Sequence, residues 1–145
     1  MKIKILTSAA AVMLLSAFTP IFLAEKDLVG TWKIDNASVA TTVKRVIAKA
    51  VEANPGAEDQ IEEQKDKIVE MIQGIRLNIK ADHTYESVTP QGTAPGKWVL
   101  ANKDRVIEFT KADGTTRRDS ILESSATRLR LINGQLKDTI LYIHP

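Results

Sequence analysis

The chain has no cysteine, and its 145 residues include only two histidines, His83 and His144. The lack of cysteine excludes disulfide bonds, thiol catalysis, cysteine-ligated zinc and a lipid-modified N-terminal cysteine. Two histidines leave little for a histidine-based metal or acid–base site, so we expect neither a metal nor a cofactor. Aromatic residues make up only 5% of the chain. Any core must therefore be filled mainly by leucine and isoleucine.

The chain also has no net charge once its N-terminus is set aside. Of the 20 lysines and arginines, Lys2 and Lys4 lie in the first 24 residues, which leaves 18 against 18 aspartates and glutamates. Nucleic-acid binding depends on neutralising phosphates, so this balance argues against a nucleic-acid partner. The length suits one domain. The proportions of 43% hydrophobic and 26% charged residues are typical of a soluble globular protein.

A basic start followed by a long apolar run distinguishes the N-terminus. Residues 1–4 carry two lysines, residues 5–24 are uncharged and almost wholly apolar, and Glu25, Lys26 and Asp27 end the run. This pattern is typical of a secretory signal peptide. The run is also long enough to remain as a membrane anchor, because about 20 helical residues cross the hydrocarbon layer. Both interpretations place residues 25–145 outside the cytoplasm, either periplasmic or secreted, and the second tethers them to the membrane.

Short segments of alternating hydrophobicity predict an antiparallel β-protein. A first strand at 28–34 precedes two helical patterns, one ending at Asn54-Pro55-Gly56 and one from about 57 to 73, which predict a helical hairpin at about 36–73. Seven further strands follow at about 75–80, 85–89, 96–101, 105–110, 115–122, 127–132 and 136–143. Short connections favour a meander that closes into a barrel. The predicted fold is therefore mainly β, an eight-stranded antiparallel barrel at 25–145 with a two-helix insertion after the first strand.

The lengths of the turns predict which side chains share one face of the sheet, because a slip of one residue reverses every side chain. Two-residue turns at Asn102-Lys103, Asp113-Gly114 and Asn133-Gly134, with a four-residue loop at 123–126, define the registers. The residues placed inside are Trp98, Leu100, Ile107, Phe109, Leu122, Leu129, Leu131, Leu136, Ile140 and Tyr142. The charged residues placed outside are Arg117, Asp119, Arg128, Arg130 and Lys137.

The same registers turn two charged residues, Arg118 and Asp138, toward the interior. A buried charge needs a partner, water or a position near the barrel mouth, and these two residues lie within diagonal reach of each other. At the first hairpin, a three-residue loop at 82–84 turns Tyr85 inward with Ile79. It also gives His83 a left-handed backbone, which histidine tolerates better than most residues.

Several short motifs resemble those of lipid-binding barrels. Gly30-Thr31-Trp32-Lys33 resembles both the Gly-x-Trp start of lipocalins and the Gly-Thr-Trp-Lys start of cytosolic fatty-acid-binding proteins. The later motifs are Asp82-His83-Thr84-Tyr85, Gly96-Lys97-Trp98, Asp113-Gly114 and Leu129-Arg130-Leu131, and they are similar to those of small secreted bacterial lipocalin-like domains of the calycin superfamily. The resemblance covers about 28–143 apart from the helices, and it implies a binding fold without a particular ligand. His83 replaces the family's turn glycine, and the helical pair is longer than the lid of fatty-acid-binding proteins.

We therefore expect an exported lipocalin-like protein that binds a small hydrophobic or amphipathic molecule in the barrel, with the helical pair as a lid. The candidate ligand-binding residues are Trp32, Leu77, Ile79, Tyr85, Trp98, Ile107, Phe109, Arg118, Leu129, Leu131 and Tyr142. Arg118 or Tyr142 would orient a polar end of the ligand, as interior arginines do in fatty-acid-binding proteins. Three alternatives stay open: the tryptophans as core, Arg118 paired with Asp138, and the helices as a fixed cover that buries one outer wall or fills the opening.

The competing interpretation is a ligand-free barrel that acts as a protein–protein interaction module in the cell envelope, with the helices as its docking surface. The sequence shows no phosphate loop, no paired-carboxylate cleft and no Ser–His–Asp arrangement, so we do not expect an enzyme. The volume inside the barrel separates the two interpretations. An apolar void of a few hundred Å³ favours ligand binding, whereas side chains alone can fill an eight-stranded barrel.

Overall fold

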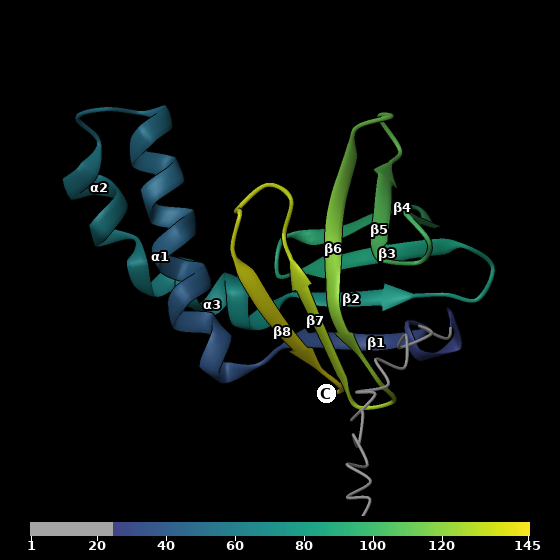
Figure 1. Ribbon diagram of the computed structural model, residues 1–145. Helices are drawn as coiled ribbons and strands as arrows, with labels where there is room; N and C mark the ends of the chain where they lie inside the picture. The colour runs from purple at the N-terminus through teal and green to yellow at the C-terminus, as the bar shows by residue number, and fades with distance from the viewer. Residues whose placement is uncertain (1–24) are drawn as a thin grey trace, which may run out of the picture.

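The computed structural model describes residues 25–145 (Figure 1), so the predicted signal peptide or anchor at 1–24 lies outside the described residues. A short turn of 3-10 helix, η1 (Glu25–Asp27), precedes β1 (Gly30–Ile34). Three helices follow: α1 (Asn36–Ala53), α2 (Glu58–Glu63) and α3 (Lys65–Gly74). The remaining strands are β2 (Arg76–Ile79), β3 (Thr84–Thr89), β4 (Gly92–Ala101), β5 (Val106–Lys111), β6 (Thr116–Ser124), β7 (Arg128–Ile132) and β8 (Thr139–Ile143).

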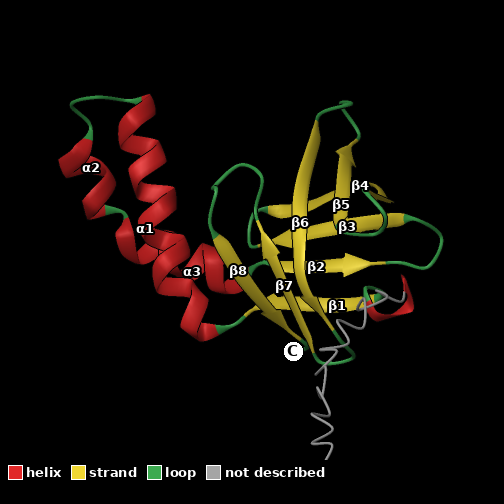
Figure 2. Ribbon diagram, viewed as in Figure 1, coloured by secondary structure: helices red, strands yellow, loops and turns green. Residues whose placement is uncertain are grey.

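The eight strands form one closed antiparallel barrel, in which each strand pairs with its neighbours in sequence and β8 returns to β1 (Figure 2). The predicted fold class, with a helical insertion after the first strand, is confirmed. The β1–β8 seam is short, with only Lys33 opposite Ile143 and Ile34 opposite Tyr142. The chain entering α1 extends this seam, because the Leu141 amide donates to Ser38 Oγ at 3.1 Å. The start of α1 is thereby tied to β8.

The helices follow from local signals, with one departure from expectation. α1 begins where the Asp35 carboxylate accepts a hydrogen bond from the Ala37 amide at 2.9 Å, as an N-cap does. The predicted second helix is divided into α2 and α3, with Gln64 between them at φ −94° and ψ 5°. Gly74 is the last residue of α3. A Cβ at Gly74 would lie 2.7 Å from the Pro90 ring, so glycine lets α3 approach the β3–β4 turn.

One end of the barrel is solid. Trp32, Ile107, Leu129 and Leu131 are fully buried, and Trp98 is 1% exposed. Both indole nitrogens are satisfied within this core: Trp32 Nε1 donates to the Leu28 carbonyl at 2.8 Å, and Trp98 Nε1 donates to the Lys80 carbonyl at 3.0 Å. The predicted inward face is therefore confirmed for the residues that fill this half.

The β5–β6 register differs from the prediction by one residue. Phe109 lies opposite Arg117, not Arg118, and the next inward position holds Asp119. The cause is the turn: the Lys111 amide donates to the Thr115 carbonyl at 2.9 Å, so the loop contains three residues and ends in Gly114 at φ 84°. A turn followed by a left-handed glycine is the common three-residue hairpin. The shift exchanges the two faces of β6.

This shift overturns the prediction that Arg118 lies inside and that Arg117 and Asp119 lie outside. The Arg118 side chain is 57% exposed on the outer wall, where its Nε lies 3.0 Å from Glu108 Oε1. Asp119 is fully buried. The Arg117 side chain is 27% exposed and lies beside it. Arg117 and Asp119, two successive inward positions of β6, thus form the charged pair inside the barrel.

Two other connections differ in length from the prediction, and β6 carries a bulge. The β4–β5 loop is two residues longer, which keeps the same faces, and Trp98 lies opposite Phe109. The β7–β8 loop spans 133–138, so Leu136 and Asp138 lie in the loop and not on a strand. A β-bulge after Ile121 leaves Leu122 47% exposed, although it was predicted inside.

The first hairpin agrees with the prediction in its main features. His83 has φ 65°, as predicted, and Tyr85 lies opposite Ile79 with both side chains buried. The loop occupies 81–83, one residue earlier than predicted, because the Lys80 amide donates to the Thr84 carbonyl at 2.9 Å.

Candidate functional site

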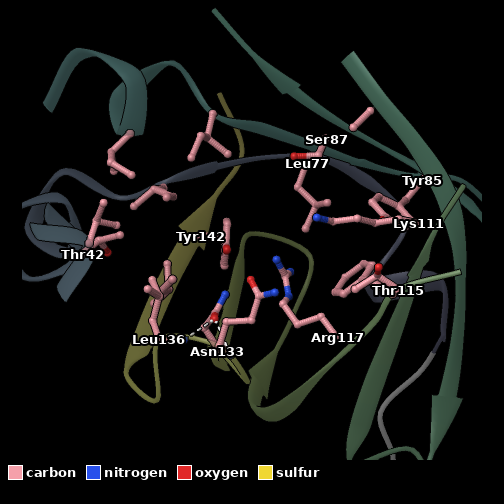
Figure 3. A pocket seen from close by; sticks show the side chains of 18 residues that line it. Thr42, Leu77, Tyr85, Ser87, Lys111, Thr115, Arg117, Asn133, Leu136 and Tyr142 are labelled. Carbon is pink, nitrogen blue, oxygen red and sulfur yellow. Dashed lines mark hydrogen bonds between the residues drawn. The ribbon is translucent and has the colours of Figure 1, made fainter. Parts of the chain in front are cut away.

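A cavity of about 360 Å³ lies at the end of the barrel beside the helices (Figure 3). It is lined by Ile34, Thr42, Val46, Ile72, Ile75, Leu77, Tyr85, Ser87, Ala94, Phe109, Lys111, Thr115, Arg117, Asn133, Gln135, Leu136, Ile140 and Tyr142. Thr42 and Val46 of α1 and Ile72 of α3 face inward-pointing strand residues across the same space. Residues of α1 and α3 therefore line the barrel mouth together with the strands.

The cavity occupies the mouth half of the barrel only. On β2, Leu77 lines the cavity and the next inward residue, Ile79, does not. On β5, Phe109 lines it and Ile107 does not. The Phe109 ring meets the Tyr85 ring edge to face, with centroids 4.9 Å apart. This aromatic pair forms the floor between the cavity and the solid half of the barrel.

Arg117 is held in the cavity wall from two sides. Its Nε lies 3.0 Å from Asp119 Oδ1, and its Nη2 lies 2.8 Å from Asp119 Oδ2. Its guanidinium carbon lies 5.0 Å from the centre of the Phe109 ring, a cation–π distance. Because a guanidinium carries five N–H donors, this pairing leaves donors that are not directed at Asp119. The buried carboxylate fixes the orientation of those donors.

The same carboxylate also anchors the β7–β8 loop, since Asp119 Oδ1 accepts a hydrogen bond from the Gly134 amide at 2.8 Å. The neighbouring Asn133 is only 6% exposed. Its Oδ1 accepts hydrogen bonds from the Gln135 and Leu136 amides, each at 2.9 Å. Because only the amide oxygen can accept these bonds, they identify which of the two side-chain atoms is Oδ1. Nδ2 therefore lies on the side of Tyr142 (Figure 3). No residue within 25–145 accepts a hydrogen bond from this nitrogen.

Two phenols line the cavity in their neutral form. Burial raises the pKa of Tyr142 to about 12, while Arg117 lowers it and Asp119 raises it further. The pKa of Tyr85 is also raised, first by burial, with Arg117 acting in the opposite direction. Both hydroxyls therefore keep their protons at neutral pH and can donate hydrogen bonds.

The charges that line the cavity are of one sign. Lys111, exposed at the rim, and Arg117 are both cationic, and none of the aspartates and glutamates within 25–145 lines the space. Asp119 lies behind Arg117 and neutralises that cation. The polar side of the cavity is thus rich in hydrogen-bond donors, whereas most of the helix side is apolar.

The structure divides the eleven predicted ligand-binding residues into three groups. Leu77, Tyr85, Phe109 and Tyr142 line the cavity. Trp32, Ile79, Trp98, Ile107, Leu129 and Leu131 are buried in the solid half and do not line it. Arg118 lies on the outer wall, which contradicts its predicted place inside.

The lining residues that sequence reasoning missed include Arg117, Lys111, Asn133 and the helix positions Thr42 and Val46. For Arg117 the available signal was Gly114, since a glycine is typical of the last position of a three-residue hairpin loop. A three-residue loop at 112–114 turns Arg117 inward. The Asn-Gly pair marked Asn133 only as a turn residue.

Both histidines lie against the tryptophans of the solid half. His83 stacks on Trp98 with ring centroids 4.8 Å apart, and its Nε2 lies 3.0 Å from Glu25 Oε1. His144 stacks on Trp32 at 4.1 Å. In the described part of the chain, no three His, Asp or Glu side chains gather closely enough to hold a metal ion. No helix there combines the length and the apolar character needed to cross a membrane.

The fold and the cavity define a class: a closed eight-stranded antiparallel barrel whose mouth, lined by mixed polar and apolar side chains, lies under a helical insertion. No protein-family model matches the chain, and no curated protein matches it significantly. Among solved structures, the chain is similar to a DUF4847 family protein from Bacteroides vulgatus. The identity is 18%, the match covers 80% of this chain and 92% of that chain, and the TM-score is 0.49.

Proposed function

We propose that the protein binds a small amphipathic molecule in the mouth cavity, with the helices α1 and α3 as its lid. The observation that carries this proposal is a space of about 360 Å³ with an apolar wall and a donor-rich wall. Small-molecule pockets measure roughly 300 to 1,000 Å³ and combine apolar walls with a few placed polar groups. The cavity therefore matches such pockets both in its volume and in its mixed lining.

Burial of hydrocarbon supplies the driving force for such binding. At roughly 25 cal/mol per Å², covering about 150 Å² of ligand hydrocarbon contributes roughly 4 kcal/mol. Loss of translational and rotational freedom opposes binding by at least about that amount. A preformed polar anchor is therefore needed as well, and Arg117, fixed by Asp119 and Phe109, supplies one without further ordering.

The N-terminal pattern supports a place for this activity outside the cytoplasm. Two lysines and the apolar run at 5–24 are the features of an export signal or of a retained anchor. A binding protein of this kind would meet its ligand in the periplasm, outside the cell or at the membrane surface.

The competing function is a ligand-free module for protein interaction in the envelope. That function requires no interior space, and the solid half of the barrel would suffice for a rigid scaffold. The unfilled mouth favours ligand binding, because side chains alone can fill an eight-stranded barrel.

The test is displacement of a fluorescent lipophile, anilinonaphthalene sulfonate, from the purified protein, with native mass spectrometry to identify any retained molecule. Val46→Trp places a large side chain in the cavity and should abolish probe binding while the thermal unfolding transition remains cooperative. Val99→Trp, at an outer-wall position that is 49% exposed, is the matched control and should leave binding unchanged. Equal probe binding by all three proteins would contradict the proposal.

A further inference from the structure

We infer that the aromatic floor formed by Tyr85 and Phe109 limits the ligand to a compact molecule of about a dozen non-hydrogen atoms. This inference rests on the proposed function and names the size class of molecule that the cavity takes. A long-chain lipid would gain no affinity from the part of its chain beyond that length. The inference follows from where the cavity ends, from the packing that holds the floor and from the volume above it.

The cavity ends inside the barrel. On β1, β2, β5 and β6, one inward residue lines the cavity, and the next inward residue toward the solid half does not. These pairs are Ile34 and Trp32, Leu77 and Ile79, Phe109 and Ile107, and Arg117 and Asp119. The second residue of each pair is at most 2% exposed. The space open to a ligand therefore does not continue into the solid half.

The two rings of the floor are held by contacts on several sides. Gly96 of β4 lies opposite Tyr85, and a Cβ at Gly96 would lie 2.5 Å from the Tyr85 ring. The Tyr85 ring therefore packs directly against the β4 backbone. The Phe109 ring lies between the edge-to-face contact with Tyr85 and the Arg117 guanidinium, and Trp98 lies opposite it on β4. Because close-packed side chains resist displacement, a ligand meets a fixed surface at this depth.

The volume above the floor sets the size of the ligand. A water molecule takes up about 30 Å³ of the liquid, and a methylene group is of similar size. The cavity of about 360 Å³ therefore holds about twelve non-hydrogen atoms. Decan-1-ol nearly fills this space. Further carbon atoms would extend out of the mouth into water, where they bury no more apolar surface and add no driving force.

The experiment measures the affinity of straight-chain alcohols, from hexan-1-ol to tetradecan-1-ol, by competition with anilinonaphthalene sulfonate below the solubility limit of each alcohol. We expect the affinity to rise about fourfold with each methylene up to decan-1-ol, since burial of one methylene contributes about 0.8 kcal/mol. From dodecan-1-ol to tetradecan-1-ol we expect a total gain of less than about twofold. A rise of about fourfold per methylene that continues to tetradecan-1-ol would overturn the inference while the proposed function stands.

Variants of the floor test which residue sets the length limit, the chain length at which the affinity stops rising. Phe109→Ala should move the limit to longer chains, so that tetradecan-1-ol binds about tenfold more tightly than dodecan-1-ol. Phe109→Leu leaves a smaller void, which costs less stability, and should move the limit in the same direction by less. Ser87→Leu places a larger side chain above the floor, where Ser87 lines the cavity, and should move the limit to shorter chains.

Ile107→Val is the matched control, because Ile107 is the next inward residue of β5 below the floor and does not line the cavity. It should leave the length limit unchanged. A limit that stays the same in Phe109→Leu and in any folded Phe109→Ala protein, or that moves equally in Ile107→Val, would overturn the inference. Failure of every alcohol to displace the probe would overturn the inference and the proposed function together.

Discussion

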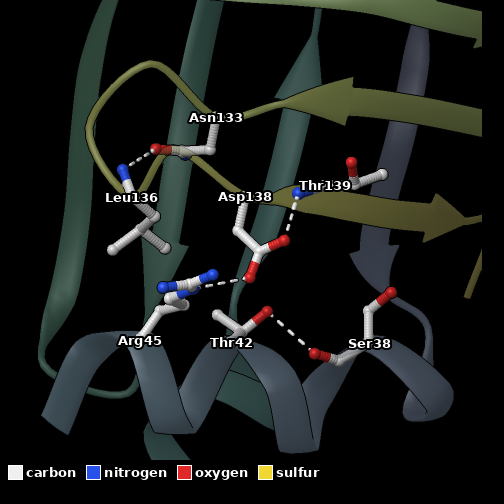
Figure 4. Close-up of polar contacts among 7 residues, drawn as sticks. All are labelled: Ser38, Thr42, Arg45, Asn133, Leu136, Asp138 and Thr139. Carbon is white, nitrogen blue, oxygen red and sulfur yellow. Dashed lines mark hydrogen bonds and ion pairs between the residues drawn. The ribbon is translucent and has the colours of Figure 1, made fainter. Parts of the chain in front are cut away.

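Arg45 Nε on α1 lies 2.8 Å from Asp138 Oδ2 in the β7–β8 loop (Figure 4). The pKa of Asp138 is lowered, first by the hydrogen bond from Arg45 and then by that from the Thr139 amide. Both connected segments line the cavity, since α1 supplies Val46 and the loop supplies Asn133. This ion pair therefore joins α1 to the loop that carries part of the polar wall.

Breaking this pair should change the rate of ligand exchange more than stability. The Arg45 side chain is 56% exposed, and exposed ion pairs contribute at most about 1 kcal/mol. In Arg45→Gln we expect the free energy of unfolding to fall by less than about 1 kcal/mol, and probe dissociation to be roughly two to five times faster. Stopped-flow displacement and urea unfolding measure the two quantities.

A matched control exists on the barrel wall, where Lys80 Nζ lies 2.7 Å from Glu86 Oε1. That pair is similarly exposed but does not touch the helices. Lys80→Gln should leave the rate of probe dissociation unchanged. Unaltered dissociation in Arg45→Gln would show that α1 moves independently of the loop.

The division of the barrel into a solid half and a cavity predicts that stability and binding can be separated. Leu129 is fully buried and does not line the cavity. Leu129→Ala should reduce the free energy of unfolding by about 2–5 kcal/mol and leave probe affinity unchanged under conditions where the protein stays folded. Leu77→Ala, at a cavity wall, should reduce both. A parallel loss of affinity in Leu129→Ala would mean that the two halves are not independent.

The architecture was predictable because its signals are redundant, whereas the register of β6 was not. Turn residues and alternation recur along the chain, so an error in one turn leaves the strand count intact. The two extra residues in the β4–β5 loop did not change which side chains were predicted to point inward, since a shift of two residues preserves the faces of the sheet. The register of β6 is not fixed by its own sequence. The strand begins Thr-Arg-Arg-Asp-Ser, and no apolar residue before Ile121 marks the inward face.

The candidate site was less predictable than the fold for a related reason. Its polar wall depends on that single register and on the β7–β8 loop, whose length is set by hydrogen bonds from the Gln135 and Leu136 amides to Asn133. An Asn-Gly pair alone favours a two-residue turn. The helix contributions to the cavity depend on tertiary packing, which hydrophobic periodicity within the helices does not specify.

Gly74 should show a reversal of its usual effect. At a helical position, Gly→Ala normally stabilises by up to about 1 kcal/mol, but a Cβ here would lie 2.7 Å from the Pro90 ring. We therefore expect Gly74→Ala to destabilise the protein alone and to stabilise it in a Pro90→Ala background. Thermal or urea unfolding of the four proteins forms a double-mutant cycle. Stabilisation by Gly74→Ala in both backgrounds would show that α3 is not held against the β3–β4 turn.

The pH dependence of stability should reveal the buried phenol of Tyr142. Its pKa is raised from 10.0 to about 12 by burial, so the folded protein holds the proton more tightly than the unfolded chain does. The associated stability is complete below pH 10 and is lost as the pH rises toward 12, because the unfolded chain ionises first. At 1.36 kcal/mol per unit, the loss amounts to about 3 kcal/mol.

Tyr142→Phe isolates this loss, since all other titrating groups remain. The free energy of unfolding of the wild type should fall more steeply than that of Tyr142→Phe between pH 10 and 12, and the two curves should run parallel from pH 7 to 9. Ultraviolet titration at the phenolate band provides a second readout, in which both tyrosines should ionise later than a free phenol and Tyr142→Phe should lose the later transition. Parallel stability curves across the whole alkaline range would mean that Tyr142 titrates like an exposed tyrosine, and its hydroxyl would then not lie in a closed cavity wall.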